Sequence, residues 1–161
     1  MEELWRNNNR GRTQGFLQRK EDKHEHGVGF LVHNDIVNTV MECRPVSSRL
    51  ITICLTAVPF NIIVVQVYAP TSNYEYDDNE IEEFCDQLQN VIDQTPKKDI
   101  LVVQGDCNVN VGKNVCENWQ GICRLYCDDD MNERGLRLLD FATFNDLVLT
   151  NTFGHHKASR R

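Results

Sequence analysis

The stretch D-I-L-V-V-Q-G-D-C-N-V-N-V-G, residues 99–112, decides the fold because an apolar run passes directly into polar residues. Residues 100–103 are aliphatic throughout, which predicts a strand buried on both faces of a sheet. The run ends at Gly105, and Asp106 and Asn108 follow with one residue between them. Because side chains alternate along an extended chain, we expect both to point the same way at the carboxyl end of this strand.

Two interpretations of this polar end are open from the residues alone. The carboxyl ends of strands are common places for sites in α/β sheets. A carboxylate beside a carboxamide can orient a water molecule, accept its proton and hold a hard cation. Glycine, aspartate and asparagine are also turn formers, so the same residues fit a plain turn.

The chain before this stretch predicts four further strands separated by short turns. They are residues 27–32, 36–41, 49–58 and 62–67. Short connections make such neighbours antiparallel, and Pro45 is expected to break the second of them. The fourth is almost wholly apolar and is therefore expected at the centre of the sheet. It ends at Tyr68, whose phenol can donate to a phosphate oxygen or belong to a core tyrosine with a solvated tip.

Two helices are predicted from apolar residues that recur with a spacing of three to four. The first follows Asp78 and stops before Pro96, and the second follows Asn132, which is a plausible N-cap. Residues 147–150 are expected to form a last short strand. Alternating strands and helices of this kind predict an α/β (α+β) fold.

The first 23 residues differ from the rest of the chain. They are polar, include three consecutive asparagines and show little apolar periodicity, so a disordered leader is expected at 1–23, with the domain at 24–161. The 161 residues include 17 basic and 24 acidic side chains, for a net charge of −7. Such a balance is unexpected for a protein that grips phosphate backbones directly, but it suits a site that recruits a cation first.

The cysteines and the apolar runs bear on the compartment. No secretory signal peptide and no run of ~18 apolar residues is visible, so neither secretion nor a membrane span is expected. Seven cysteines, an odd number without a C-x-x-C pair, favour free core thiols in a reducing compartment. We therefore expect an intracellular protein, nuclear or cytoplasmic. Cys116, Cys123 and Cys127 match no familiar zinc-ligand spacing, which favours structural thiols over a zinc cluster.

Six segments together carry a resemblance to a known family. They are G-V-G-F-L-V from Gly27, S-R-L-I-T from Ser48, V-Y-A-P-T from Val67, G-D-C-N-V-N-V-G from Gly105, N-E-R-G-L-R-L-L-D-F from Asn132 and N-D-L-V-L-T-N-T from Asn145. In this order and spacing they resemble the endonuclease/exonuclease/phosphatase family, and in particular the RTE-like endonuclease domains of non-LTR retrotransposons. The resemblance covers residues 24–161.

The resemblance implies a fold, a reaction and a set of site residues. The fold is a four-layer α/β sandwich of the DNase I-like type, here partial, with two mixed β-sheets flanked by helices. The reaction is Mg²⁺- or Mn²⁺-dependent cleavage of a phosphodiester in DNA. Asp106 corresponds to the residue that activates the attacking water, Asn108 to the one that positions water and phosphate, and Tyr68 to a donor to the phosphate. Asp106 and Asn108 are the expected metal ligands.

The departures from the family pattern bear on activity. The family begins with strands that carry an asparagine and a metal-binding glutamate, and residues 1–23 contain no such pattern. It ends with Ser-Asp-His, whereas His155 and His156 follow Gly154. We therefore expect a fragment with impaired catalysis and weak or absent metal binding. The alternative is a non-catalytic interaction or remnant protein that keeps part of the fold, with protein partners that the sequence does not indicate.

Overall fold

The computed structural model describes residues 5–9, 13–18, 27–71, 78–112, 118–124 and 131–154. The chain forms two compact units, Met1–Cys107 and Asn108–Arg161. Each unit has a hydrophobic core of its own. The described residues include two sheets and three α-helices, so the chain has a mixed α/β fold.

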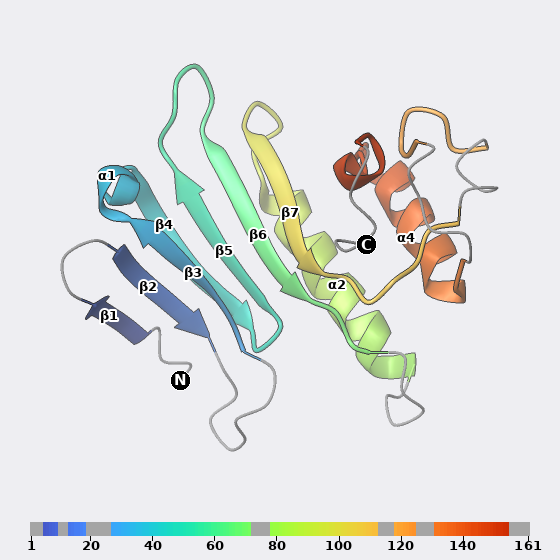
Figure 1. The fold of residues 1–161 in the computed structure, drawn as a ribbon, viewed down its shortest axis with the longest axis horizontal. Helices are drawn as coiled ribbons and strands as arrows, with labels where there is room; N and C mark the ends of the chain where they lie inside the picture. The colour runs from blue at the N-terminus through green and yellow to red at the C-terminus, as the bar shows by residue number, and fades with distance from the viewer. Residues whose placement is uncertain are drawn as a thin grey trace. The chain divides into compact units, whose positions relative to one another are not determined.

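The first sheet has the antiparallel order β1-β2-β3 (Figure 1). Its strands are β1 (Trp5–Asn9), β2 (Thr13–Gln18) and β3 (Val28–His33). The sequence predicts no regular structure before residue 24, yet two strands form there. They form because β2 pairs with β3, with Phe16 opposite Phe30, and this pairing leaves Phe16 only 4% exposed. The sheet is wholly antiparallel in the described residues, so only the second sheet is mixed.

The second sheet has the order β4-β5-β6-β7. Its strands are β4 (Val40–Ser47), β5 (Leu50–Leu55), β6 (Ile62–Tyr68) and β7 (Ile100–Asp106). The first three are antiparallel neighbours and β6 lies inside the sheet, as predicted. The first predicted strand of the series, residues 27–32, does not join them, because it forms β3 of the other sheet. β7 runs parallel to β6. A parallel neighbour requires a crossover, which here contains helix α2 (Asp78–Gln94).

The structure corrects the prediction of a strand at residues 36–41. Asn34–Val37 instead form the short helix α1, and the side chain of His33 caps it by accepting a hydrogen bond from the Asp35 amide. Pro45 does not break β4 but lies within it, opposite Ile51. It is tolerated there because β4 is the outer strand of the sheet, where a missing amide donor costs little.

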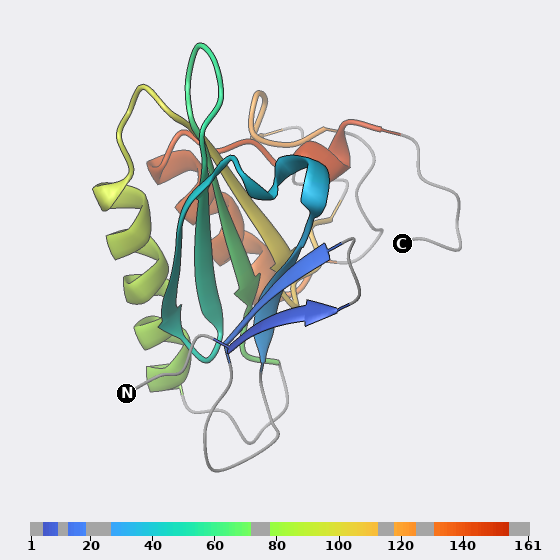
Figure 2. The same cartoon turned by 90° about the vertical axis from the view of Figure 1, so that its left-hand side faces the viewer.

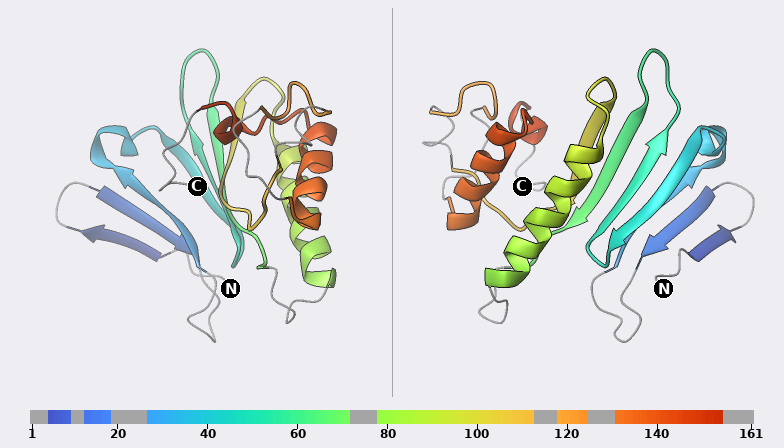
Figure 3. Two further views of the ribbon diagram at one scale, coloured as in Figure 1. Left: turned by 45° about the vertical axis from the view of Figure 1, so that its right-hand side comes forward. Right: turned by 180° about the vertical axis from the view of Figure 1, so that it is seen from behind.

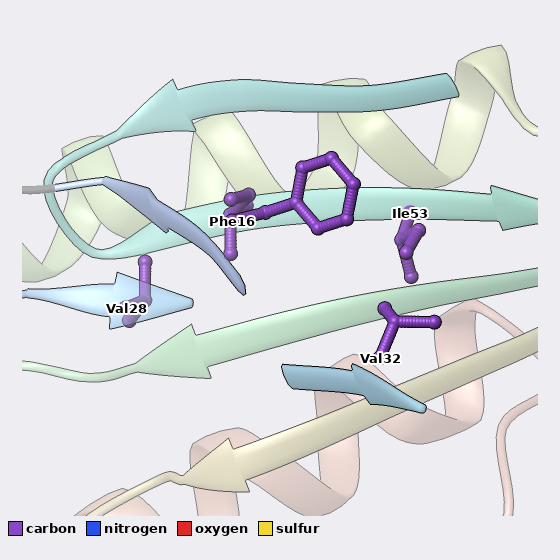
Figure 4. Packing of buried hydrophobic residues seen from close by; sticks show 5 residues of the cluster. Phe16, Val28, Val32 and Ile53 are labelled. Atoms are coloured by element: carbon purple, nitrogen blue, oxygen red, sulfur yellow. The ribbon is translucent and has the colours of Figure 1, made fainter. Parts of the chain in front are cut away.

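The two faces of the second sheet are covered by different elements. Figure 2 shows α2 and the first sheet on opposite sides of it, and the rear view of Figure 3 shows α2 in front of the sheet. Phe84, Leu88 and Val91 are the buried apolar residues of α2, at the predicted helical spacing. On the other face, Phe16, Val28 and Val32 of the first sheet pack with Ile51 and Ile53 of β5 (Figure 4).

β7 is less buried than the sequence predicts. The register places Val102 beside Val64 of β6. Val64 packs against the core between the sheets. Nevertheless, Ile100 is 48% and Val102 38% exposed, so one face of β7 is open to solvent. The prediction of a strand buried on both faces is therefore wrong. An apolar run predicts a strand but does not reveal how far the facing sheet extends.

The second unit is built around helix α4 (Glu133–Phe144). Leu139 of this helix is fully buried and packs with Cys123. The predicted strand at 147–150 is wrong: the chain is irregular there and passes into the 3-10 helix Thr150–Thr152. The Leu149 amide donates to the carbonyl of Ile122 at 2.7 Å, but the described residues extend this bond into no ladder.

Within the described part of the chain, five cysteines are thiols and not disulfides: Cys43, Cys54, Cys85, Cys107 and Cys123. Burial, and to a lesser degree the charge of Glu42, raise the pKa of Cys43 to about 11. Cys116 and Cys127 lie outside the described residues. Among the helices described, none has the length and apolar character needed to span a bilayer.

Candidate functional site

Tyr68 and Asp106 end two neighbouring parallel strands and lie directly opposite each other. β6 ends at Tyr68, β7 ends at Asp106, and the two residues are register partners (Figure 1). The Ala69 amide donates to the carbonyl of Asp106 at 2.8 Å, so the pairing continues just past the strand ends. Because partners in a parallel pair share a face, both side chains lie on the same side of the sheet.

This end of the sheet joins an apolar interior to a polar rim. Tyr68 is partly buried against the core between the two sheets, whereas Asp106 is exposed. On the same face, two residues before them, the Gln104 side chain donates to that of Gln66 at 3.2 Å. A phenol, a carboxylate and two carboxamides are therefore presented along adjacent strands, and such groups can hold a water molecule or a phosphate oxygen.

Gly105 brings the two strands together immediately before Asp106. It has φ +136, a conformation that side-chain-bearing residues rarely adopt. A Cβ atom at this position would collide with the carbonyl oxygen of Val67, its register partner on β6. The absence of a side chain is thus what allows the close approach that places Asp106 opposite Tyr68.

Cys107 follows Asp106 and is partly buried. Burial raises the pKa of the Cys107 thiol, and the negative charge of Asp106 raises it further. The thiol is therefore kept neutral beside the carboxylate, and the polar group that faces solvent at this position is Asp106.

Asn108 is the first residue of the second unit. It has φ +51, in the left-handed region that asparagine tolerates better than most residues. The two units are not placed relative to each other, so the convergence of Asn108 with Asp106 and Tyr68 stays a prediction. Within the second unit, Asn132 fixes the loop that follows Asn108. Its side-chain oxygen accepts hydrogen bonds from the amide of Asn110, at 3.2 Å, and from the amide of Gly135, at 2.8 Å. The predicted N-cap at Asn132 is confirmed.

Arg49 is a residue of this region that sequence reasoning missed. Its guanidinium carbon lies 5.6 Å from the centre of the Tyr68 ring, and Nη1 donates to the Tyr68 carbonyl at 3.4 Å. Its Nη2 lies 3.8 Å from a carboxylate oxygen of Glu80 in the first turn of α2. The available signal was a charged residue directly before the apolar strand β5, in a segment that the resemblance already singled out.

Comparison with known proteins gives a relative for most of the chain. No protein-family model matches the sequence. Craniofacial development protein 2 from Bos taurus and from Tragulus javanicus are each 36% identical over 135 residues, or 84% of the chain. The chain is homologous to craniofacial development protein 2. It spans 22% of the length of either craniofacial development protein 2 sequence, so the homology concerns one part of a longer protein.

A solved structure shows a related fold. The endonuclease domain of TRAS1, a telomere-specific non-LTR retrotransposon, matches with a TM-score of 0.51 and 15% identity. The match covers 81% of this chain and 52% of that domain. Together with the homology to craniofacial development protein 2, it confirms the predicted resemblance to a retrotransposon endonuclease. At this identity, the structural likeness establishes the fold and not the activity.

The described residues do not complete a site for the magnesium ion that the resemblance implies. No three His, Cys, Asp or Glu side chains in the described part of the chain gather closely enough to hold a metal ion. In the first unit, the carboxyl ends of β6 and β7 offer one carboxylate, that of Asp106, beside neutral oxygens. Mg²⁺ gives up its waters reluctantly and is usually held by carboxylates in near-octahedral geometry. The donor set therefore does not fit a tightly held ion.

We expect Mg²⁺ and Mn²⁺ to bind this chain weakly, with a dissociation constant on the order of millimolar. The binding should weaken further with added salt, because a net charge of −7 attracts cations diffusely and is screened. Titration followed by NMR at two ionic strengths measures this. Micromolar binding that survives salt and is lost in Asp106→Asn would instead require a further carboxylate. Glu25, Asp128 and Asp130 are the first to test and lie outside the described residues.

Proposed function

We propose that this chain is part of a divalent-metal-dependent phosphodiesterase domain, derived from a retrotransposon endonuclease, whose substrate is DNA. The observation that carries the proposal is the register pairing of Tyr68 with Asp106 at the carboxyl ends of β6 and β7. The homology to craniofacial development protein 2 and the fold shared with the TRAS1 endonuclease domain support it. We further propose that the two sheets and their helices belong to a partial four-layer α/β sandwich.

Each residue would act on a different part of the reacting group. The carboxylate of Asp106 is exposed and acceptor-only, so it would orient a water molecule and accept its proton. The phenol of Tyr68 would donate a hydrogen bond to a phosphate oxygen as negative charge develops there. Asn108 would position the water and the phosphate through its carboxamide.

We also propose that the 161-residue chain by itself is catalytically impaired. In the described residues, the ends of β6 and β7 contribute a single carboxylate to metal binding, and the sequence lacks the Ser-Asp-His of the family pattern. The same observation favours the alternative function, a non-catalytic interaction or remnant protein that keeps part of the fold. The two hypotheses differ in whether the Tyr68–Asp106 end of the sheet still recognises DNA.

We expect no nicking of supercoiled plasmid above the buffer background when this chain is incubated with Mg²⁺ or Mn²⁺. Removing a metal ligand or a transition-state donor commonly costs about 10²- to 10³-fold in rate, and two such groups lack a match in the chain. Gel electrophoresis of the plasmid over a time course measures the rate. Robust nicking by the wild-type chain that disappears in Asp106→Ala would contradict the impairment and place the chemistry at Asp106.

DNA binding at this end of the sheet tests the function itself. A short duplex with non-cleavable phosphorothioate linkages, added with Mg²⁺, should shift the NMR signals of Tyr68, Ala69 and Asp106. The control variant Asp86→Asn, which changes an exposed acidic residue on α2, should show the same duplex-induced shifts as the wild-type chain. Signal changes confined to other surfaces, or none, would reject DNA recognition at this end of the sheet and favour the interaction or remnant protein.

A further inference from the structure

We propose that Arg49 is a positioning residue that holds Tyr68 in the orientation needed to meet a phosphate oxygen, an inference that rests on the proposed function. Arg49 contacts Tyr68 in three ways. Its carbonyl accepts the Tyr68 amide at 2.9 Å, its Nη1 donates to the Tyr68 carbonyl at 3.4 Å, and its guanidinium lies over the ring. Arg49 therefore holds both the backbone and the ring of Tyr68, through its side chain and its backbone carbonyl.

The position of Arg49 suits this role better than a role as a surface ion pair. Its side chain is only 12% exposed, so little of it is available for solvent or for a ligand. The ion pair with Glu80, whose side chain is 51% exposed, anchors the second guanidinium nitrogen to the first turn of α2. The planar guanidinium has donors in a fixed fork, which lets it contact Glu80 and the Tyr68 carbonyl while it stacks on the ring.

Tyr68 needs such support because of where it lies. It is the last residue of β6, and Pro70 two residues later has no amide to donate to a sheet. Its ring packs on one side against the core between the sheets, and Arg49 covers the ring face. A phenol held in this way loses little rotamer freedom when it donates to a phosphate oxygen, which is how a preorganised donor gains strength.

The first measurement uses the ligand-free full chain and does not depend on DNA. With ring-labelled tyrosine, the Tyr68 signals are identified by their loss in Tyr68→Phe. Arg49→Gln should shift and broaden them, Arg49→Lys should restore part of the shift because it keeps a cation near the ring, and Glu80→Gln should give an intermediate shift without threatening the fold. Arg44→Gln, which removes an exposed arginine bonded to Gln94, is the charge-matched control and should leave the Tyr68 signals unchanged.

The second measurement is a double-mutant cycle on binding of the phosphorothioate duplex. Arg49→Lys should weaken binding roughly three- to tenfold in the wild-type background, because lysine keeps the charge near the ring but not the fork of donors that reaches the Tyr68 carbonyl and Glu80. In the Tyr68→Phe background it should have no further effect, because phenylalanine keeps the ring but not the donor that Arg49 positions. A purely structural arginine would weaken binding equally in both backgrounds.

The outcomes separate this inference from the proposed function. Unchanged Tyr68 ring signals in Arg49→Gln would overturn the positioning role while leaving the proposed function standing. An equal effect of Arg49→Lys in the wild-type and Tyr68→Phe backgrounds would do the same. If the wild-type chain shows no duplex-induced change at Tyr68, the proposed function fails and the positioning role fails with it.

Discussion

Replacing Gly105 with alanine should lower the free energy of unfolding of the first unit by about 2–4 kcal/mol. Two physical effects add at this position. Alanine is strained at φ +136, and its Cβ atom would collide with the carbonyl oxygen of Val67 unless β6 and β7 moved apart. Such a movement would also weaken the hydrogen bond from the Ala69 amide to Asp106. Urea denaturation followed by circular dichroism gives the change in unfolding free energy.

Gly15→Ala is the matched control for this effect. Gly15 also lies in a strand of the first unit, but a Cβ atom there would meet only the tip of Leu31, at 4.0 Å. We expect its unfolding free energy to stay within about 0.5 kcal/mol of wild type. A denaturation midpoint for Gly105→Ala as high as that of Gly15→Ala would show that β6 and β7 do not approach closely at this residue.

Replacing Phe16 with alanine should cost about 3–5 kcal/mol of unfolding free energy, the largest effect that we expect in the chain. Phe16 is the large side chain that β2 contributes to the core between the two sheets, where it packs with Val28, Val32, Ile51 and Ile53 (Figure 4). Its removal leaves a cavity, because the paired strands around it can relax inward only in part. Urea denaturation again measures the loss.

The neighbouring residue provides the control for Phe16. Leu17 points to the other face of β2 and is 47% exposed, so Leu17→Ala should change the unfolding free energy by about 0.5 kcal/mol or less. If Phe16→Ala were as mild as Leu17→Ala, the first sheet would not contribute to the core. The first 23 residues would then behave as the disordered leader that their composition predicts.

The elements that the sequence predicted well are those with a strong local signal. Three such signals each determine structure within a few residues: the 3.6-residue period of α2, the aliphatic runs of β6 and β7, and the N-cap at Asn132. Tyr68 and Asp106 could be placed at the ends of neighbouring strands on the same basis. Their catalytic roles came from the resemblance and stay predictions, as does the placement of Asn108.

The features that the sequence did not predict depend on distant partners. The strands in the first 23 residues have few apolar residues, and β2 is defined by its pairing with β3. Residues 147–150 have strand-like composition, but in the described part of the chain no second strand pairs with them. The sequence marks Arg49 only as a charged residue before an apolar strand. Its role depends on contacts that join the start of β5, the end of β6 and the first turn of α2.

The shared hydrogen-bond acceptor of Asn132 has a dynamic consequence. One side-chain oxygen holds both the Asn110 amide in the loop and the Gly135 amide in the first turn of α4. A Cβ atom on Gly135 would collide with the Asn110 carbonyl, so the two segments also touch through their backbones. The loop and the helix terminus therefore open as one cooperative unit of local unfolding. Any ligand that orders the loop after Asn108 would, by linkage, suppress fraying of α4 as well.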